Sequence, residues 1–155
     1  MKKEWKIWVD TGGTFTDCLA ESPNGKIIRQ KVLSSSCLRG TLTSINSPVE
    51  INFQLHQITP AQFTLGQSIR ILGEESEYIK IIDQPTPNTL HLEKPLNSKT
   101  EIGESIEILF DLEAPILAAR LATSSPPNKP LPPLTMHLAT TKGTNALLEE
   151  KGADV

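Results

Sequence analysis

The chain has 155 residues, a formal net charge of −3 and 5% aromatic residues, which allows one medium domain or two small ones with a core of Ile, Leu, Val and Ala. The weak negative charge and the scattered Lys and Arg residues argue against nucleic acid as a partner. No apolar run reaches the length of a membrane span, and no signal peptide follows Met1, so we expect no membrane partner and a cytoplasmic location.

The first motif is the stretch 9–17, Val-Asp-Thr-Gly-Gly-Thr-Phe-Thr-Asp. Residues 5–9 before it and 18–20 after it favour strands, so Gly12-Gly13 is predicted to form a tight hairpin turn with positive φ angles. Such a turn directs successive backbone N–H groups to one place and forms an anion site. An ordinary hairpin whose threonines cover a pleated surface is the alternative.

The candidate cofactor-binding residues in this motif offer a carboxylate, a hydroxyl or a backbone N–H group: Asp10, Thr11, Gly12, Gly13, Thr14, Thr16 and Asp17. Asp10 ends the first predicted strand, where its carboxylate would hold Mg²⁺ through a water molecule. The threonine hydroxyls would reach phosphate oxygens. The motif therefore predicts a phosphate site with a metal ion.

The sequence between residues 42 and 111 has a different texture. Its short alternating segments are separated by polar or Gly/Pro turns, and they predict a small antiparallel β-barrel. These segments are 49–56, 67–72, 78–82, 89–93 and 105–110. Before them, Ser22-Pro23-Asn24-Gly25 predicts a turn and residues 26–33 a further strand, which ends at three serines.

After the barrel, Asp111 is predicted to cap a helix over 112–123. Residues 124–133 form a proline-rich connector, which is a spacer or, alternatively, an interaction ligand. The remaining residues predict a strand (134–139), a polar loop (140–143) and a helix (146–151) that Gly152 ends. We expect the chain to be a fragment that ends in mid-fold, because such a helix normally leads into another strand.

The motifs at 9–17 and 138–152 together resemble the two signatures of the hydantoinase/5-oxoprolinase family. The second motif reads Leu-Ala-Thr-Thr-Lys-Gly-Thr-Asn-Ala-Leu-Leu-Glu-Glu-Lys-Gly. It departs from the family's approximate pattern, L-G-T-T-V-A-T-N-A-L-L-E-R-K-G, at Ala139, Lys142, Gly143 and Glu150. The resemblance covers the two ends of the chain and, more weakly, the helix at 112–123, so residues 42–111 are interpreted as an insertion.

The resemblance implies an α+β or mixed α/β fold: a partial actin-like (ribonuclease H-like) ATPase lobe with an inserted small antiparallel β-barrel. The expected domains are 1–41, the hairpin part of the lobe, and 42–111, the inserted β-rich domain. Residues 112–155 then return to the lobe.

The family also implies an ATP-dependent hydrolase that opens a cyclic amide such as 5-oxoproline or a hydantoin, with relatives that act on ketones. ATP and Mg²⁺ are the implied cofactors, and phosphoryl transfer turns the amide oxygen into a leaving group. In the second motif, the candidate substrate or phosphate residues are Thr140, Thr141, Thr144 and Asn145, beside the predicted helix N-terminus. A capped helix with a purely structural role is the alternative. Catalytic residues are not identifiable from the sequence.

We expect no turnover by this chain alone, because a second lobe and the adenine-binding residues are missing from it. A second subunit or domain is therefore a candidate partner. The competing hypothesis is a non-catalytic binding or assembly module that uses the barrel and the proline-rich connector. His137 is a candidate base, although a lone His on a strand is more often structural, and His56 and His91 lack the neighbours of a zinc site.

Overall fold

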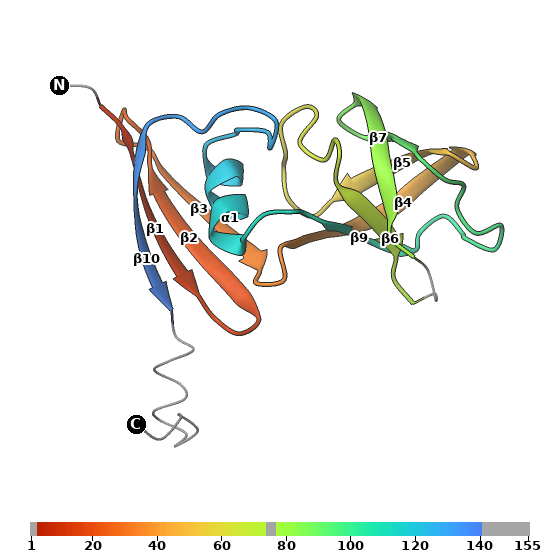
Figure 1. Ribbon diagram of the computed structural model, residues 1–155, viewed down its shortest axis with the longest axis horizontal. Coiled ribbons are helices and arrows are strands. Elements are labelled where there is room, and N and C mark those ends of the chain that lie inside the picture. The colour runs from red at the N-terminus through yellow and green to blue at the C-terminus, as the bar shows by residue number, and fades with distance from the viewer. Residues whose placement is uncertain (1–2, 74–76, 141–155) are drawn as a thin grey trace, which may run out of the picture. The chain divides into compact units, whose positions relative to one another are not determined.

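The computed structural model describes residues 3–73 and 77–140. In these ranges the chain forms ten strands and one helix, arranged in two sheets (Figure 1). It divides into two compact units: residues 1–36, 112–123 and 130–155 belong to the first, and residues 37–111 and 124–129 to the second. No helix in the described ranges is long and apolar enough to cross a membrane.

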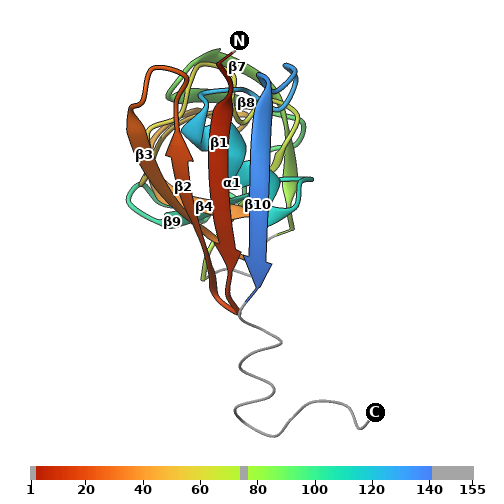
Figure 2. The same cartoon turned by 90° about the vertical axis from the view of Figure 1, so that its left-hand side faces the viewer.

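The first unit contains a four-stranded sheet in the order β10-β1-β2-β3 (Figure 2). The strands are β1 (Trp5–Thr11), β2 (Phe15–Glu21), β3 (Ile27–Leu33) and β10 (Leu134–Thr140). β1, β2 and β3 form an antiparallel meander, whereas β10 pairs with β1 in parallel, from Trp5 opposite Leu134 to Thr11 opposite Thr140. The sheet therefore joins distant parts of the chain, and β1 and β10 end at the same edge.

One face of this sheet is covered by α1 (Ala114–Ala122). Nine residues are too few for a helix that is stable alone in water, so α1 depends on the packing of its buried face. That face presents Leu117, Leu121 and four alanines to the strands, whose buried side chains include Ile7 and Ala20. The other face of the sheet stays exposed.

The predicted helix cap at Asp111 is wrong. The N-cap is Glu113, and its side chain makes no capping hydrogen bond. Pro115 lies in the first turn, where its fixed φ angle suits a helix and its missing N–H group costs no hydrogen bond. The proline, rather than a capping carboxylate, therefore sets where this helix begins.

The second unit is a closed barrel of six antiparallel strands in the order β4-β5-β8-β7-β6-β9. The strands are β4 (Cys37–Ser47), β5 (Glu50–Leu55), β6 (Ser68–Ile71), β7 (Ile79–Thr86), β8 (Thr89–Leu92) and β9 (Ser105–Leu109). The five predicted segments correspond to β5 through β9, whereas β4, the longest strand, is not predicted. Because β4 begins at Cys37, the first segment of the first unit ends at residue 36, whereas the sequence suggested a boundary after residue 41.

The predicted fold class, α+β or mixed α/β with a partial actin-like (ribonuclease H-like) ATPase lobe, is wrong. The described residues are mostly strand, with α1 as their single helix and with two sheets. The barrel supplies six of the ten strands, and the helix predicted at 146–151 lies outside the described residues. What forms is a β-rich chain in which one short helix covers one sheet face.

Glu107 holds three neighbouring barrel strands together on their outer face. It is 4% exposed and lies between Arg39 of β4 and Arg70 of β6 in the sheet register. Its carboxylate is 3.3 Å from Nε of Arg39 and 3.1 Å from Nη2 of Arg70, and Tyr78 donates a 2.8 Å hydrogen bond to it. Burial alone would raise the pKa of Glu107, but the Tyr78 hydrogen bond and the two guanidinium groups hold that pKa below 4.5.

Acid should therefore destabilise the barrel through Glu107. Because the carboxyl pKa is lower in the folded than in the unfolded chain, its contribution is complete above pH 4.5 and is lost as the pH falls through the folded-state value. In urea denaturation at a series of pH values, Glu107→Gln should flatten the acid loss of unfolding free energy. Glu93→Gln, at an exposed position, is the control. If the free energy of unfolding falls equally steeply with decreasing pH in Glu107→Gln and in the unmodified chain, this role of Glu107 is contradicted.

At Gly40 the backbone of β5 approaches β4 closely. A Cβ atom there would lie 2.2 Å from the backbone oxygen of Gln54, a contact that only backbone movement relieves. Gly40→Ala should lower the free energy of unfolding by about 1–3 kcal/mol, as over-packing does. Gly13→Ala is the matched control, since a Cβ atom there meets nothing within 4 Å. Similar losses for both variants in urea denaturation would show that the Gly40 contact is not limiting.

Candidate functional site

Gly12, Gly13 and Thr14 connect β1 to β2. The Gly12 N–H group donates a 2.9 Å hydrogen bond to the Phe15 carbonyl, so Gly13 and Thr14 are the central residues of the turn. Neither Gly12 nor Gly13 has a positive φ angle, and the predicted turn centred on the two glycines is therefore wrong. Gly13 is exposed, with open space where a side chain would stand, so a ligand can approach its backbone closely.

The parallel pairing of β1 with β10 brings the start of the second motif beside the first. Thr11 and Thr140 end their strands opposite each other, and the Thr140 hydroxyl donates a 3.4 Å hydrogen bond to the Thr11 carbonyl. Ala139 is the register partner of Asp10. The carboxyl ends of β1 and β10 therefore lie side by side. Thr141, Thr144 and Asn145 lie outside the described residues.

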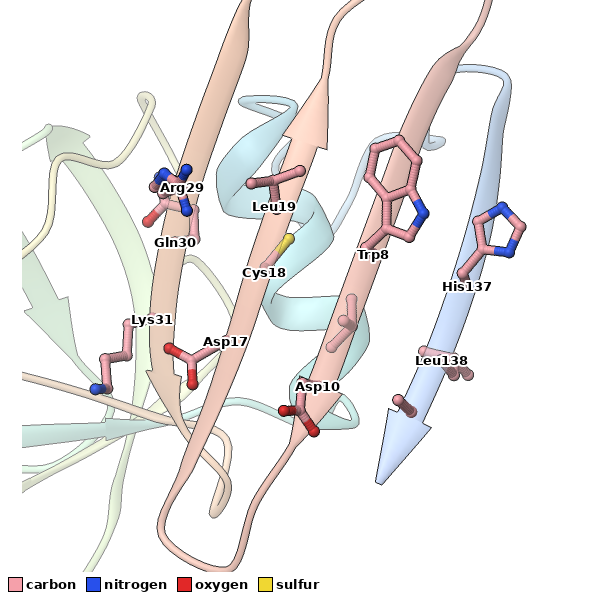
Figure 3. Close-up of a pocket in the computed structure, with 12 residues that line it drawn as sticks. Trp8, Asp10, Asp17, Cys18, Leu19, Arg29, Gln30, Lys31, His137 and Leu138 are labelled. Atoms are coloured by element: carbon pink, nitrogen blue, oxygen red, sulfur yellow. The ribbon is translucent and has the colours of Figure 1, made fainter. Parts of the chain in front are cut away.

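Asp10 and Asp17 occupy opposite positions on β1 and β2. They are register partners, and both are exposed on the sheet face opposite α1 (Figure 3). Like charges directly opposite each other destabilise a sheet. Lys31 of β3 is the next residue in this row, opposite Asp17, and its Nζ atom lies 4.7 Å from the centre of the Phe15 ring. In this row one cation therefore stands beside two carboxylates, and Arg29 of β3 lines the groove farther from the hairpin.

The exposed sheet face forms a groove of about 490 Å³. Asp10 and Asp17 line its end near the hairpin, and Trp8 and His137 lie farther along the same face (Figure 3). The rings of Trp8 and His137 stack, with their centres 5.9 Å apart and their planes at 13°. His137, considered as a base from its sequence position, therefore stands in the groove with one ring face against an indole.

Thr16 lies on the opposite side of the sheet from this groove. It is fully buried, and its hydroxyl is 2.9 Å from the Ser34 hydroxyl. The other candidates of the first motif lie nearer the solvent: Asp10, Gly13, Thr14 and Asp17 are exposed, while Thr11 and Gly12 are half-buried. Six of the seven candidates thus lie at the hairpin edge. The Thr16 hydroxyl instead contacts Ser34 on the buried face, and the Ser34 hydroxyl bonds to the hairpin at Gly12.

Cys18 offers no reactive thiol to the groove at neutral pH. It is among the residues that line the groove, but its side chain alternates with Asp17 along β2 and faces the α1 side, where it is only 4% exposed and burial raises its pKa to about 11. The thiol therefore stays protonated and is a poor nucleophile.

A cation at Asp10 and Asp17 needs ligands beyond the protein. In the described part of the chain, no group of three or more His, Cys, Asp or Glu residues could hold a metal ion. Mg²⁺ commonly keeps several waters and binds through one or two carboxylates together with substrate phosphates. Two exposed carboxylates beside an open hairpin fit that type of binding.

Two residues of this site were missed from the sequence, although the predicted turn at Ser22 to Gly25 contains the signal for both. That turn places Glu21 opposite Ile27, and each step back along β2 is then one step forward along β3. Counting in this way places Lys31 opposite Asp17. The same count places Ser34 opposite Thr14, where the Ser34 N–H group donates a 2.8 Å hydrogen bond to the Thr14 carbonyl.

No protein-family model, curated protein or solved structure matches this chain. The hydantoinase/5-oxoprolinase family therefore stays a prediction from the two motifs.

When no metal is bound, the opposed carboxylates of Asp10 and Asp17 should lower the free energy of unfolding by a measurable amount. Asp10→Asn removes one of the two opposed charges, so it should raise the free energy of unfolding by about 0.2–1 kcal/mol in low-salt buffer with EDTA. The gain should shrink in 1 M salt, which screens exposed charges. Asp111→Asn, at an exposed position outside the sheet, is the control for urea denaturation. A loss of stability in Asp10→Asn would contradict the repulsion.

Proposed function

We propose that this chain supplies the phosphate-binding edge of an ATP-dependent enzyme that opens cyclic amides, of the 5-oxoprolinase or hydantoinase type. The observation that carries the proposal is the seven-residue parallel register of β1 with β10. It sets Thr140, where the second motif begins its polar loop, beside Thr11 of the first motif. The first motif and the described start of the second, residues 138–140, thus lie at one edge of one sheet.

The charges at this edge support a site for a metal-bound phosphate rather than for a free anion. Asp10 and Asp17 would repel an isolated phosphate, since both carboxylates are exposed at the hairpin end of the groove. A divalent cation would offset that repulsion, because its charge would attract both the carboxylates and the phosphate. Asp10 would hold Mg²⁺ through water, as its place at the end of β1 suggests.

The hairpin would hold the phosphate with backbone and hydroxyl donors. Gly13 leaves its backbone accessible, and the exposed Thr14 adds a hydroxyl next to it. Thr16 is not part of this set, because its hydroxyl is buried with Ser34. Fixed donors of this kind act by positioning the phosphate and by offsetting its charge, which is most of what phosphoryl-transfer sites do.

ATP would phosphorylate the amide oxygen. Water could then attack the ring carbon, because the phosphorylated oxygen is a good leaving group. Among the described residues, the candidate phosphate ligands lie on one side of the ligand only, so we propose that this chain does not turn over substrate alone. A second domain or subunit would complete the site. Cys18 and Cys37 are buried and form no disulfide, which agrees with a reducing, cytoplasmic location.

Titration of the isotope-labelled chain with Mg²⁺–ATP tests the proposal. The backbone amide resonances of Gly13 and Thr14 should shift, with millimolar affinity, which is worth about 4 kcal/mol. Asp10→Asn should weaken binding about tenfold or more, because Mg²⁺ loses a carboxylate. Asp111→Asn should leave it unchanged.

Two outcomes would contradict the proposal. If the Gly13 and Thr14 resonances do not shift on addition of Mg²⁺–ATP, there is no phosphate site at the hairpin. That result would favour a binding module that uses the barrel. ATP hydrolysis stimulated by 5-oxoproline or hydantoin in the purified chain would show that nothing further is needed to complete the site.

A further inference from the structure

Ser34 is bonded to both sides of the β1–β2 hairpin, although it lies beyond the end of β3. Its hydroxyl donates a 2.8 Å hydrogen bond to the Gly12 carbonyl, and its N–H group donates another of 2.8 Å to the Thr14 carbonyl. The Thr16 hydroxyl lies 2.9 Å from the same Ser34 hydroxyl. A serine hydroxyl has one proton, and Gly12 receives it, so Thr16 must be the donor in this second contact.

These bonds fix the direction of the peptide group between Gly12 and Gly13. Thr16 is fully buried and alternates with Asp17 along β2, so Thr16 and the bonded Ser34 hydroxyl lie on the face that packs against α1. The Gly12 carbonyl therefore points toward that face. In a trans peptide the following N–H group points the opposite way, so the Gly13 N–H group is directed toward the face that carries Asp10 and Asp17.

Without Ser34 this peptide group has little else to hold it. Glycine tolerates a wide range of backbone angles, so a peptide group between two glycines rotates at small steric cost. The Gly12 N–H group remains bonded to Phe15, but that bond does not orient the Gly12 carbonyl. The Ser34 hydroxyl therefore selects one orientation of a peptide group that the sequence leaves free.

We infer that Ser34 is a positioning residue, which turns the Gly13 N–H group toward the metal-bound phosphate. This inference rests on the proposed function, since it assigns the orientation of that site's backbone donor. Ser34 itself would not touch the ligand, because its hydroxyl lies behind the hairpin on the α1 side. Its removal should therefore weaken binding through the mobility of the hairpin.

Four variants separate this role from a general effect on folding. Ser34→Ala removes the hydroxyl, Ser34→Thr keeps it, and Ser35→Ala at the next, exposed position is the matched control. Ser34→Ala leaves the buried Thr16 hydroxyl without its partner, which destabilises a protein. The double variant Ser34→Ala/Thr16→Val removes both hydroxyls and leaves no such group unsatisfied.

Each variant is titrated with Mg²⁺–ATP in the full chain, and thermal unfolding is measured beside it. We expect Ser34→Ala and the double variant to bind about tenfold more weakly, the loss of one well-aligned hydrogen bond. Ser34→Thr should recover most of the affinity, and Ser35→Ala should match the unmodified chain. Without ligand, the Gly12 carbonyl carbon and Gly13 amide resonances should move in Ser34→Ala and return in Ser34→Thr.

The outcomes distinguish the inference from the function on which it rests. Binding by the unmodified chain with undiminished affinity in the folded double variant would overturn the role of Ser34 and leave the proposed function standing. Absence of binding by the unmodified chain would overturn both. Weaker binding in the double variant with an unmoved Gly12 carbonyl resonance would also overturn the inference, since the peptide group would then be held by something else.

Discussion

The parallel pairing of β1 with β10 is the constraint on which the first unit depends. Strands β1, β2 and β3 form a local meander, but β10 joins it from more than a hundred residues later. Parallel neighbours need a long crossover, and this chain fills its crossover with the six-stranded barrel and α1. Such a long connection is thermodynamically acceptable because the entropy of loop closure grows only slowly with loop length. The barrel also has its own core, so it does not rely on the sheet for its buried surface.

The same pairing explains why the candidate site is formed by residues that are remote in sequence. Thr140 meets Thr11 only because the register runs to the last residue of both strands. On the adjacent strand, Asp17 meets Asp10 because the hairpin turn is short. A binding site of the proposed kind would conflict with stability, and two carboxylates placed directly opposite each other fit such a conflict. Elsewhere on the chain, Glu107 shows the opposite arrangement, with one carboxylate held between two guanidinium groups.

The sequence predicts most strands of both sheets, because alternation and turn residues are local signals. The turn at Ser22 to Gly25 and the segments that become β5 through β9 are found in this way. β4 is not predicted, because the serines before it suggest the end of a strand. In addition, Gly40 and several polar residues weaken the alternation of apolar and polar residues along β4. Gly40 is present for a reason that no local pattern reveals, the close approach of the β5 backbone. The predicted fold class is wrong for a different reason. It was taken from the family resemblance, which implies helices, whereas the described residues are mostly strand.

The sequence motifs propose where the candidate site lies, but they do not give its internal arrangement. Side-chain type alone suggested that Thr16 reaches a phosphate, and only the alternation of β2 turns it to the buried face. The turn was placed on two glycines because glycine is permissive, whereas the hydrogen bond from Gly12 to Phe15 centres it one residue later. Ser34 has no motif of its own. Its contact with the hairpin follows from the register of β2 with β3, which is a property of the sheet.

Paramagnetic broadening by Mn²⁺–ATP is the most direct test of where a metal-bound phosphate sits. The barrel provides the comparison position, because His91 lies 2.7 Å from Glu50 and 3.6 Å from Asp83 in a cluster that is not arranged to hold a metal ion. The account predicts that the amide resonances of Asp10, Gly13 and Ala139 broaden first as Mn²⁺–ATP is added. Earliest broadening around His91, or equal broadening over both units, would contradict a phosphate site at the ends of β1 and β10.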